Sequence, residues 1–215
     1  RRRWPGTGPQ VAQLERRFVG RKGGGVAVAV SSGTAALHLA LAALGVGAGD
    51  EVITSAMTFC STVHAIVHAG AAPVLADCDR RTFNLTAETI APRITPRTKA
   101  LLVVHMCGRC CDMDPILALA GRHNLLVVED CAHAIEASYR SRPAGLLGDA
   151  GAFSFYVTKN ATAVEGGLVL TGRAAMERDL RELAYHGMDC DAWQRRGCDG
   201  YRHYEAVRVG FKYNL

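Results

Sequence analysis

The chain alternates short apolar runs with longer stretches in which apolar residues recur at helical spacing. The apolar runs predict strands at 26–30, 51–54, 73–76, 99–105, 125–129, 151–155 and 168–171. The stretches with helical spacing predict helices at 11–21, 35–44, 62–69, 86–94, 112–123 and 174–186.

Strands that are apolar throughout and joined by helices favour a mostly parallel sheet covered on both faces. We therefore expect an α/β fold, a three-layer α/β/α sandwich, in residues 1–188. Residues 189–215 are polar and irregular in pattern, and we expect them to connect to a smaller C-terminal domain. The chain begins without Met and ends abruptly, so we expect a piece of a longer protein.

Composition narrows the class of protein. The 215 residues are 49% hydrophobic and 21% charged, near the globular average. The net charge of +5 is carried by scattered Arg residues, without the basic stripe of a nucleic-acid binder, and it suits anionic small molecules. No apolar run reaches the roughly 18 residues of a membrane span, and no secretory pattern opens the chain. We expect a cytoplasmic protein with neither a nucleic-acid nor a membrane partner.

The eight cysteines are interpreted as structural thiols, because most of them sit inside apolar strand or helix patterns. The one suggestive cluster is Cys107, Cys110 and Cys111. A zinc site would need a second pair at similar spacing, so we expect no metal site. A metal-binding protein built on this cluster is kept as an alternative, which predicts zinc in the purified protein.

The sequence lacks several motifs that are common in α/β proteins. The turn at 31–36 has one glycine where a dinucleotide fingerprint needs three, and no phosphate-binding Walker sequence occurs. The Gly-x-Ser-x-Gly motif of hydrolases is also absent. His64 and His68 share a helix face, but Ala65 stands where a zinc protease carries Glu.

The chemistry of pyridoxal phosphate fits better, beginning with its phosphate. Ser31, Ser32, Gly33 and Thr34 lie where an apolar strand turns into a helix. Glycine permits close approach of the backbone, hydroxyls donate hydrogen bonds, and a helix N-terminus favours an anion. An ordinary helix cap explains the same residues equally well.

The cofactor also needs a carboxylate that keeps its pyridine nitrogen protonated. The predicted strand at 125–129 ends in an acid, Glu129, and a second acid, Asp130, follows it directly. This is the end of a strand at which parallel sheets bind ligands. We prefer Asp130 because it is the last residue of the run, although a role in capping the next helix is the alternative. His133 follows in the same loop and is placed to reach the ring hydroxyl.

A lysine must form a Schiff base with the cofactor. Of four lysines, Lys159 is the best placed, because it follows the strand at 151–155 and precedes a Gly pair. Ser154 offers a hydroxyl to the phosphate, and Phe59 offers a flat apolar face to the ring.

These residues occur in the order phosphate loop, aromatic, acid, serine and lysine, as in fold-type I aminotransferases. The chain resembles the DegT/DnrJ family of nucleotide-sugar aminotransferases along nearly its whole length. Matching motifs include Glu129-Asp-Cys-Ala-His133 and Phe153-Ser-Phe-Tyr-Val-Thr-Lys-Asn160. The other matching segments are 7–9, 31–38, 49–53, 57–59, 94–99, 105, 148–149, 165–167, 186–188 and 210–215.

The resemblance implies roles for residues at matching positions. Lys159 is the Schiff-base lysine, and Asp130 is the partner of the pyridine nitrogen. The remaining cofactor contacts that it implies are Gly33, Thr34, Ser154, Phe59 and His133. Asn214 matches an asparagine that reaches the phosphate of the neighbouring subunit, which implies a homodimer, and His186 lies near the substrate cleft.

The resemblance also implies a reaction. Relatives that dehydrate keto sugars carry His at the position of Lys159, so lysine implies transamination. The expected partners are an amino-acid donor, glutamate, and a nucleotide-activated keto sugar. Family chains run nearly twice as long as this one. A truncated chain that binds the cofactor without turnover is therefore the alternative function.

Overall fold

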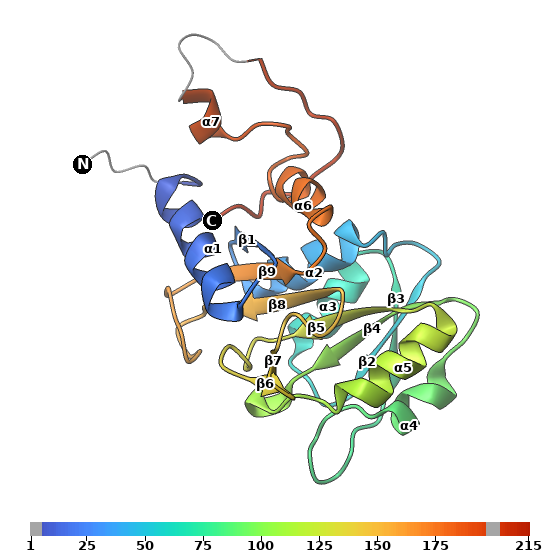
Figure 1. Ribbon diagram of the computed structural model, residues 1–215. Helices are drawn as coiled ribbons and strands as arrows, with labels where there is room; N and C mark the ends of the chain where they lie inside the picture. The colour runs from blue at the N-terminus through green and yellow to red at the C-terminus, as the bar shows by residue number, and fades with distance from the viewer. Residues whose placement is uncertain (1–5, 197–202) are drawn as a thin grey trace.

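A seven-stranded sheet with helices on both faces forms the centre of the computed structural model (Figure 1). The structure describes residues 6–196 and 203–215, without the side chains of residues 192 and 196. The strands of the sheet are β1 (Val26–Val30), β2 (Glu51–Ser55), β3 (Ala72–Ala76), β4 (Thr98–Val104), β5 (Leu126–Asp130), β8 (Ala150–Ser154) and β9 (Gly167–Thr171).

The strand order is β1-β9-β8-β5-β4-β2-β3. The pairs β2–β3, β2–β4, β4–β5 and β5–β8 are parallel, whereas β9 runs antiparallel to both β1 and β8. β1 therefore runs in the same direction as the parallel strands, and its carboxyl end lies at the same edge of the sheet as theirs. The expectation of a mostly parallel sheet is confirmed.

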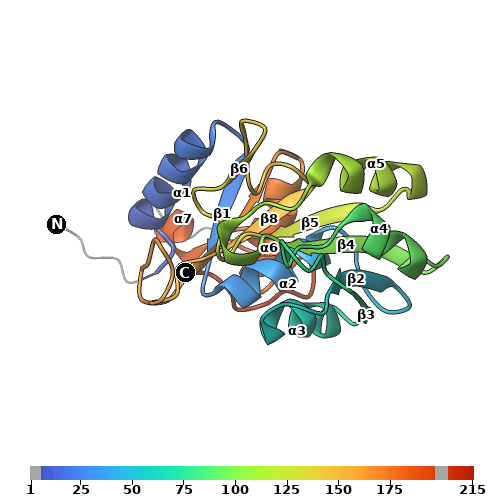
Figure 2. The same ribbon diagram turned by 90° about the horizontal axis from the view of Figure 1, so that it is seen from below.

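Helices cover both faces of the sheet, as Figure 2 shows. One layer holds α2 (Gly33–Ala43), α3 (Cys60–His68) and α6 (Met176–Ala184). The other holds α1 (Pro9–Lys22), α4 (Ala87–Ile90) and α5 (Met113–His123). The predicted three-layer α/β/α sandwich is confirmed.

Alternation along the strands supplies both layers with buried side chains, because successive residues of a strand point to opposite faces. Within β4, Ala100, Leu102 and Val104 pack in the core that includes α2 and α3. Leu101 and Val103 pack in the core under α4 and α5. Among the residues that the structure describes, no helix combines the length and apolar character needed to cross a membrane.

Three elements differ from the sequence prediction. The helix expected at 86–94 stops at Ile90 and continues as one 3-10 turn, Ala91–Arg93, because Pro92 has no N–H for the helical ladder. A hairpin of β6 (Ser138–Tyr139) and β7 (Arg142–Pro143) was not predicted, since two-residue strands are too short to show a period. α7 (Ala192–Arg196) lies in the stretch expected to be irregular, and residues 197–202 of that stretch lie outside the described residues.

Candidate active site

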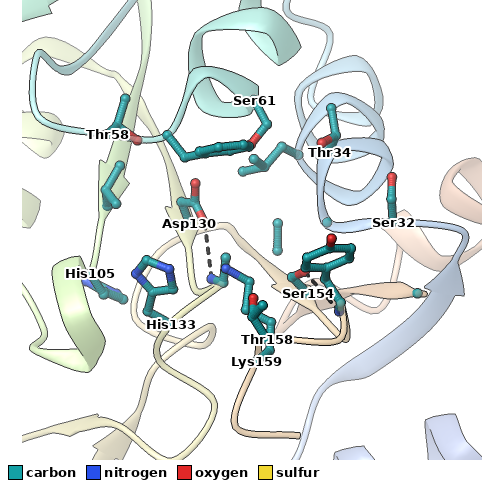
Figure 3. Close-up of a pocket in the computed structure, with 18 of the residues that line it drawn as sticks. Ser32, Thr34, Thr58, Ser61, His105, Asp130, His133, Ser154, Thr158 and Lys159 are labelled. Atoms are coloured by element: carbon teal, nitrogen blue, oxygen red, sulfur yellow. Dashed lines mark hydrogen bonds between the residues drawn. The ribbon is translucent and has the colours of Figure 1, made fainter. Parts of the chain in front are cut away.

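A cavity of about 540 Å³ opens where β4, β5 and β8 end and where α2 and α3 begin (Figure 3). This is the edge at which parallel sheets bind ligands. Seven of the nine residues predicted from the sequence line this one cavity: Gly33, Thr34, Phe59, Asp130, His133, Ser154 and Lys159. They come from segments spread over more than half of the chain.

The floor of the cavity is built by very close packing around the start of α2. Ser32 caps this helix, with its Oγ accepting from the backbone N–H of Ala35 at 3.0 Å. A Cβ added to Gly33 would lie 2.8 Å from the Cβ of Ser154, and one added to Gly167 would lie 2.2 Å from the carbonyl oxygen of Ser32. Only glycine fits at either position, so the backbone can approach a ligand closely.

Both sequence interpretations of this turn describe real features. Ser32 is an ordinary helix cap, and the helix N-terminus also faces a cavity. The hydroxyl-bearing residues Thr34 and Ser154 line the cavity beside it. A helix N-terminus with hydroxyl groups beside it is suited to an anion such as phosphate.

Asp130 ends β5 and is buried, with 5% of its surface exposed. Its Oδ2 accepts a hydrogen bond from the Thr62 hydroxyl at 2.8 Å, and its Oδ1 accepts one from the Ala132 N–H at 3.1 Å. Within the described ranges, no Lys, Arg or His forms an ion pair with it. A buried carboxylate without a cation is costly, so this position suits a ligand that carries positive charge.

His133 and Lys159 occupy the same part of the cavity as Asp130 (Figure 3). Burial lowers the pKa of the His133 imidazole, and the positive charge of Lys159 lowers it further, against the opposing effect of Asp130. These influences favour a neutral imidazole. Lys159 is half-buried in the loop after β8, and its backbone N–H donates to the Tyr156 carbonyl at 2.9 Å.

Phe59 precedes α3 at the rim of the cavity and is 73% exposed. An aromatic side chain this exposed, beside a polar cavity, presents its apolar surface to a ligand rather than to the core. Its position is compatible with the predicted stacking on a flat ring.

Asn214 and His186 lie outside the lining of this cavity. The Asn214 amide donates to the Thr7 hydroxyl at 3.1 Å, and its backbone pairs with Val30 at the end of β1. His186 is exposed, and its backbone N–H donates to the Phe211 carbonyl at 2.7 Å. A contact with a neighbouring subunit and a place near the substrate remain predictions for these two residues.

Glu129 differs from its neighbour Asp130 in that its hydrogen-bonding capacity is already used. Backbone N–H groups donate to its carboxylate from Gly145, Leu147 and Gly148, each at 2.8 Å, and His105 bonds it at 2.9 Å. The side chain is fully buried. Glu129 therefore fixes the loop before β8, which gives the choice of Asp130 a physical reason.

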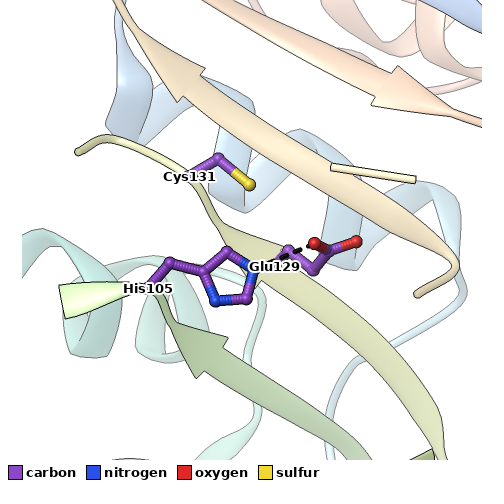
Figure 4. Close-up of side chains that lie close together, drawn as sticks. All are labelled: His105, Glu129 and Cys131. Atoms are coloured by element: carbon purple, nitrogen blue, oxygen red, sulfur yellow. Dashed lines mark hydrogen bonds and ion pairs between the residues drawn. The ribbon is translucent and has the colours of Figure 1, made fainter. Parts of the chain in front are cut away.

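A second polar group, His105, Glu129 and Cys131, is buried beside the cavity, and His105 also contributes to the cavity lining (Figure 4). The N–H of Cys111 donates to Nδ1 of His105 at 3.2 Å, so Nε2 carries the ring proton and donates to Glu129. Burial raises the pKa of the Cys131 thiol well above its usual value, which favours the neutral form. With its histidine and carboxylate atoms already hydrogen-bonded, the cluster is suited to holding β4 and β5 together.

The cysteine cluster considered for zinc is dispersed. Cys107 is exposed, while Cys111 is buried and directs its Sγ to the Val104 carbonyl at 3.3 Å. Across the described residues, Cys107, Cys110 and Cys111 do not form a group of three converging ligand atoms. The structure therefore gives the zinc alternative no support.

Thr58 and Thr62 are among the residues of the site that the sequence argument did not identify. Thr58 lines the cavity, and Thr62 is buried behind it in contact with Asp130. Their hydroxyls lie 2.7 Å apart. Threonines four residues apart are common in helices, so nothing in the sequence separated this pair from others.

The three-layer α/β/α sandwich, with its cavity at the carboxyl ends of the parallel strands, is the large-domain fold of fold-type I aminotransferases. The sequence profile of the DegT/DnrJ/EryC1/StrS aminotransferase family matches residues 1–215, and the chain belongs to this family.

Individual relatives agree with the family match. The spore coat polysaccharide biosynthesis protein SpsC of Bacillus subtilis (strain 168) is 48% identical over 212 residues, which are 99% of this chain and 54% of SpsC. An aminotransferase structure from Psychrobacter cryohalolentis superposes with a TM-score of 0.89 at 39% identity, over 97% of this chain and 53% of that one.

Spr1654 of Streptococcus pneumoniae, in its PMP-form, superposes with a TM-score of 0.91 at 32% identity. The match covers 99% of this chain and 58% of Spr1654. The chain thus spans about half the length of the relatives that it matches.

Proposed function

We propose that this chain is the cofactor-binding part of a pyridoxal phosphate-dependent aminotransferase acting on a nucleotide-activated keto sugar. One observation carries the proposal. A lysine, a buried carboxylate that forms no ion pair with any described residue, and a helix N-terminus with hydroxyl groups beside it line a single cavity. Pyridoxal phosphate supplies an aldehyde, a basic ring nitrogen and a phosphate, and when bound it acts as the electron sink for amine transfer.

Each residue has a task in that proposal. Lys159 attaches the cofactor covalently through Nζ and, when released, moves a proton at the same atom. Asp130 places negative charge at the ring nitrogen, and neutral His133 meets the ring hydroxyl. Gly33 and Ser154 would contact the phosphate at the start of α2, and Phe59 would cover one face of the ring.

The relatives support the choice of cofactor and substrate. The name of Spr1654's crystal form refers to PMP, and pyridoxamine phosphate is the aminated form of this cofactor. SpsC is named for polysaccharide biosynthesis, which fits an aminated sugar as product. Glutamate is our proposed donor, and a homodimer, with Asn214 reaching the neighbouring phosphate, is our proposed assembly.

Borohydride reduction tests the proposal directly. The protein is incubated with pyridoxal phosphate, reduced and mapped by peptide mass spectrometry. We expect a phosphopyridoxyl adduct on the peptide that contains Lys159, and none there in a Lys159→Gln variant. Lys99 and Lys212 are exposed and serve as internal controls for nonspecific labelling. Labelling of those two lysines at the same level as Lys159 would contradict the proposal.

A second candidate function is cofactor binding without turnover by a chain that spans about half the length of SpsC. Adding glutamate to the loaded protein separates the two candidates. Conversion of the bound cofactor to its amine form, followed by absorbance, supports transamination. An unchanged spectrum together with a Lys159 adduct supports binding alone.

A further inference from the structure

A short chain of hydroxyl groups leads from the cavity to the back of Asp130. Thr58 lines the cavity, and its Oγ1 lies 2.7 Å from Oγ1 of Thr62. Thr62 is fully buried in the first turn of α3, and its hydroxyl donates to Oδ2 of Asp130 at 2.8 Å. Phe59 lies between the two threonines in sequence and at the rim of the same cavity.

The direction of these hydrogen bonds follows from counting protons. A threonine hydroxyl has one hydrogen to donate and can accept through its lone pairs. Thr62 uses its hydrogen on Asp130, so Thr58 is the donor in the contact between the two threonines. The chain therefore runs from Thr58 to Thr62 to the carboxylate, and each bond polarises the next.

Donors at both oxygens of Asp130 have a chemical consequence. A buried carboxylate needs hydrogen-bond donors to offset the loss of its hydration. The Thr62 hydroxyl and the Ala132 N–H also restrict rotation of the carboxylate, because each contacts a different oxygen. The lone pairs that remain are available to a donor in the cavity.

We propose that Thr62 is a positioning residue that keeps the Asp130 carboxylate correctly turned to hold a proton on the cofactor's ring nitrogen. This inference rests on the proposed function, since it concerns the same cavity. Thr62 acts through Asp130 and does not line the cavity itself.

The test compares Thr62→Val with the wild-type chain, both loaded with pyridoxal phosphate labelled with nitrogen-15 in the ring. Valine keeps the shape of threonine and removes the hydroxyl. We expect pyridoxal phosphate affinity to fall about tenfold to a hundredfold, the range for a hydrogen bond to a charged group. We also expect the nitrogen-15 NMR signal to move toward that of the unprotonated ring, and Thr62→Ser to restore both properties.

Thr54→Val is the matched control. Thr54 is also fully buried, and its hydroxyl donates to the Leu102 carbonyl at 2.8 Å, outside the cavity lining. Its loss removes a buried hydroxyl without touching Asp130, so we expect wild-type affinity and a protonated ring. If Thr62→Val fails to fold, Thr62→Ala serves as the test variant with the same expected results.

The outcomes separate this inference from the proposed function. If Thr62→Val matches Thr54→Val in affinity and in nitrogen-15 shift, while the wild type forms the Lys159 adduct, the role of Thr62 is overturned and the proposed function stands. If the wild-type chain forms no adduct at Lys159, both fall together.

Discussion

At the scale of single residues, the site was accessible to sequence reasoning wherever the chemistry demanded a particular residue type. The chain has only four lysines, so few candidates for the Schiff-base residue had to be compared before Lys159 was selected. Asp130 was chosen over Glu129 by position alone, and the structure adds the reason, because only Glu129 is saturated by backbone donors. Thr62 escaped because its importance lies in a contact 68 residues along the chain, which spacing cannot reveal.

Gly33 provides a test at this scale. Replacing it by alanine puts a methyl group 2.8 Å from the Cβ of Ser154, so the start of α2 and the end of β8 must separate. We expect Gly33→Ala to destabilise the fold by about 1–3 kcal/mol, as overpacking does, and to weaken pyridoxal phosphate binding sharply. Thermal unfolding and a fluorescence titration measure the two effects.

Gly121→Ala is the matched control for that variant. Gly121 lies inside α5 with open space around its Cβ position, so alanine should be neutral or stabilise by up to about 1 kcal/mol. Equal behaviour of the two variants would show that the contact between Gly33 and Ser154 does not constrain the site.

At the scale of elements, the apolar runs of the sequence predicted every strand of the main sheet. Period alone does not give direction, so the antiparallel course of β9 between β1 and β8 was not foreseen. The β6–β7 turn places Arg140 and Ser141 at positive φ without the Asn-Gly signal that such turns usually carry. These parts depend on contacts between segments rather than on local pattern.

The loop before β8 owes its shape to Glu129, and a substitution checks this. In Glu129→Gln, the amide NH₂ would face N–H donors from the backbone or His105, leaving buried donors unpaired. We expect a loss of more than about 2 kcal/mol in the free energy of unfolding, measured by urea denaturation.

Glu136→Gln is the control for the Glu129 variant. This carboxylate is exposed and accepts one hydrogen bond from Asn160, so its neutralisation should change stability by less than about 0.5 kcal/mol. A similar, small change in the unfolding free energy of both variants would show that Glu129 does not fix the loop before β8.

At the scale of the whole molecule, His38 connects α2 to the end of the chain. Its ring is buried, lies 2.9 Å from the Tyr213 hydroxyl through Nδ1, and is tilted against Phe211. Burial lowers its pKa, and the neighbouring His68 lowers it further. The folded state therefore favours the neutral ring, and stability is lost as the pH falls below the ordinary value of 6.5.

His38→Gln tests this acid sensitivity, because glutamine cannot take up the proton. The difference in unfolding free energy between wild type and variant should stay constant above pH 6.5 and shift against the wild type below it. Urea denaturation over a pH series measures the difference. A constant difference across the whole series would mean that His38 does not contribute to acid sensitivity.

The place of β9 in the sheet has a consequence for biosynthesis. Among the described strands of the sheet, β1 neighbours β9 alone, from Val26 opposite Thr171 to Val30 opposite Gly167, so this strand finds its partner in the sheet only after the chain has been made as far as residue 171. Until then the growing chain exposes an unpaired strand that other chains can pair with. Gly167 also packs against Ser32 at the start of α2, so this part of the cavity is complete only after β9 has been made. A ligand that binds at the start of α2 therefore needs β9 to be in place.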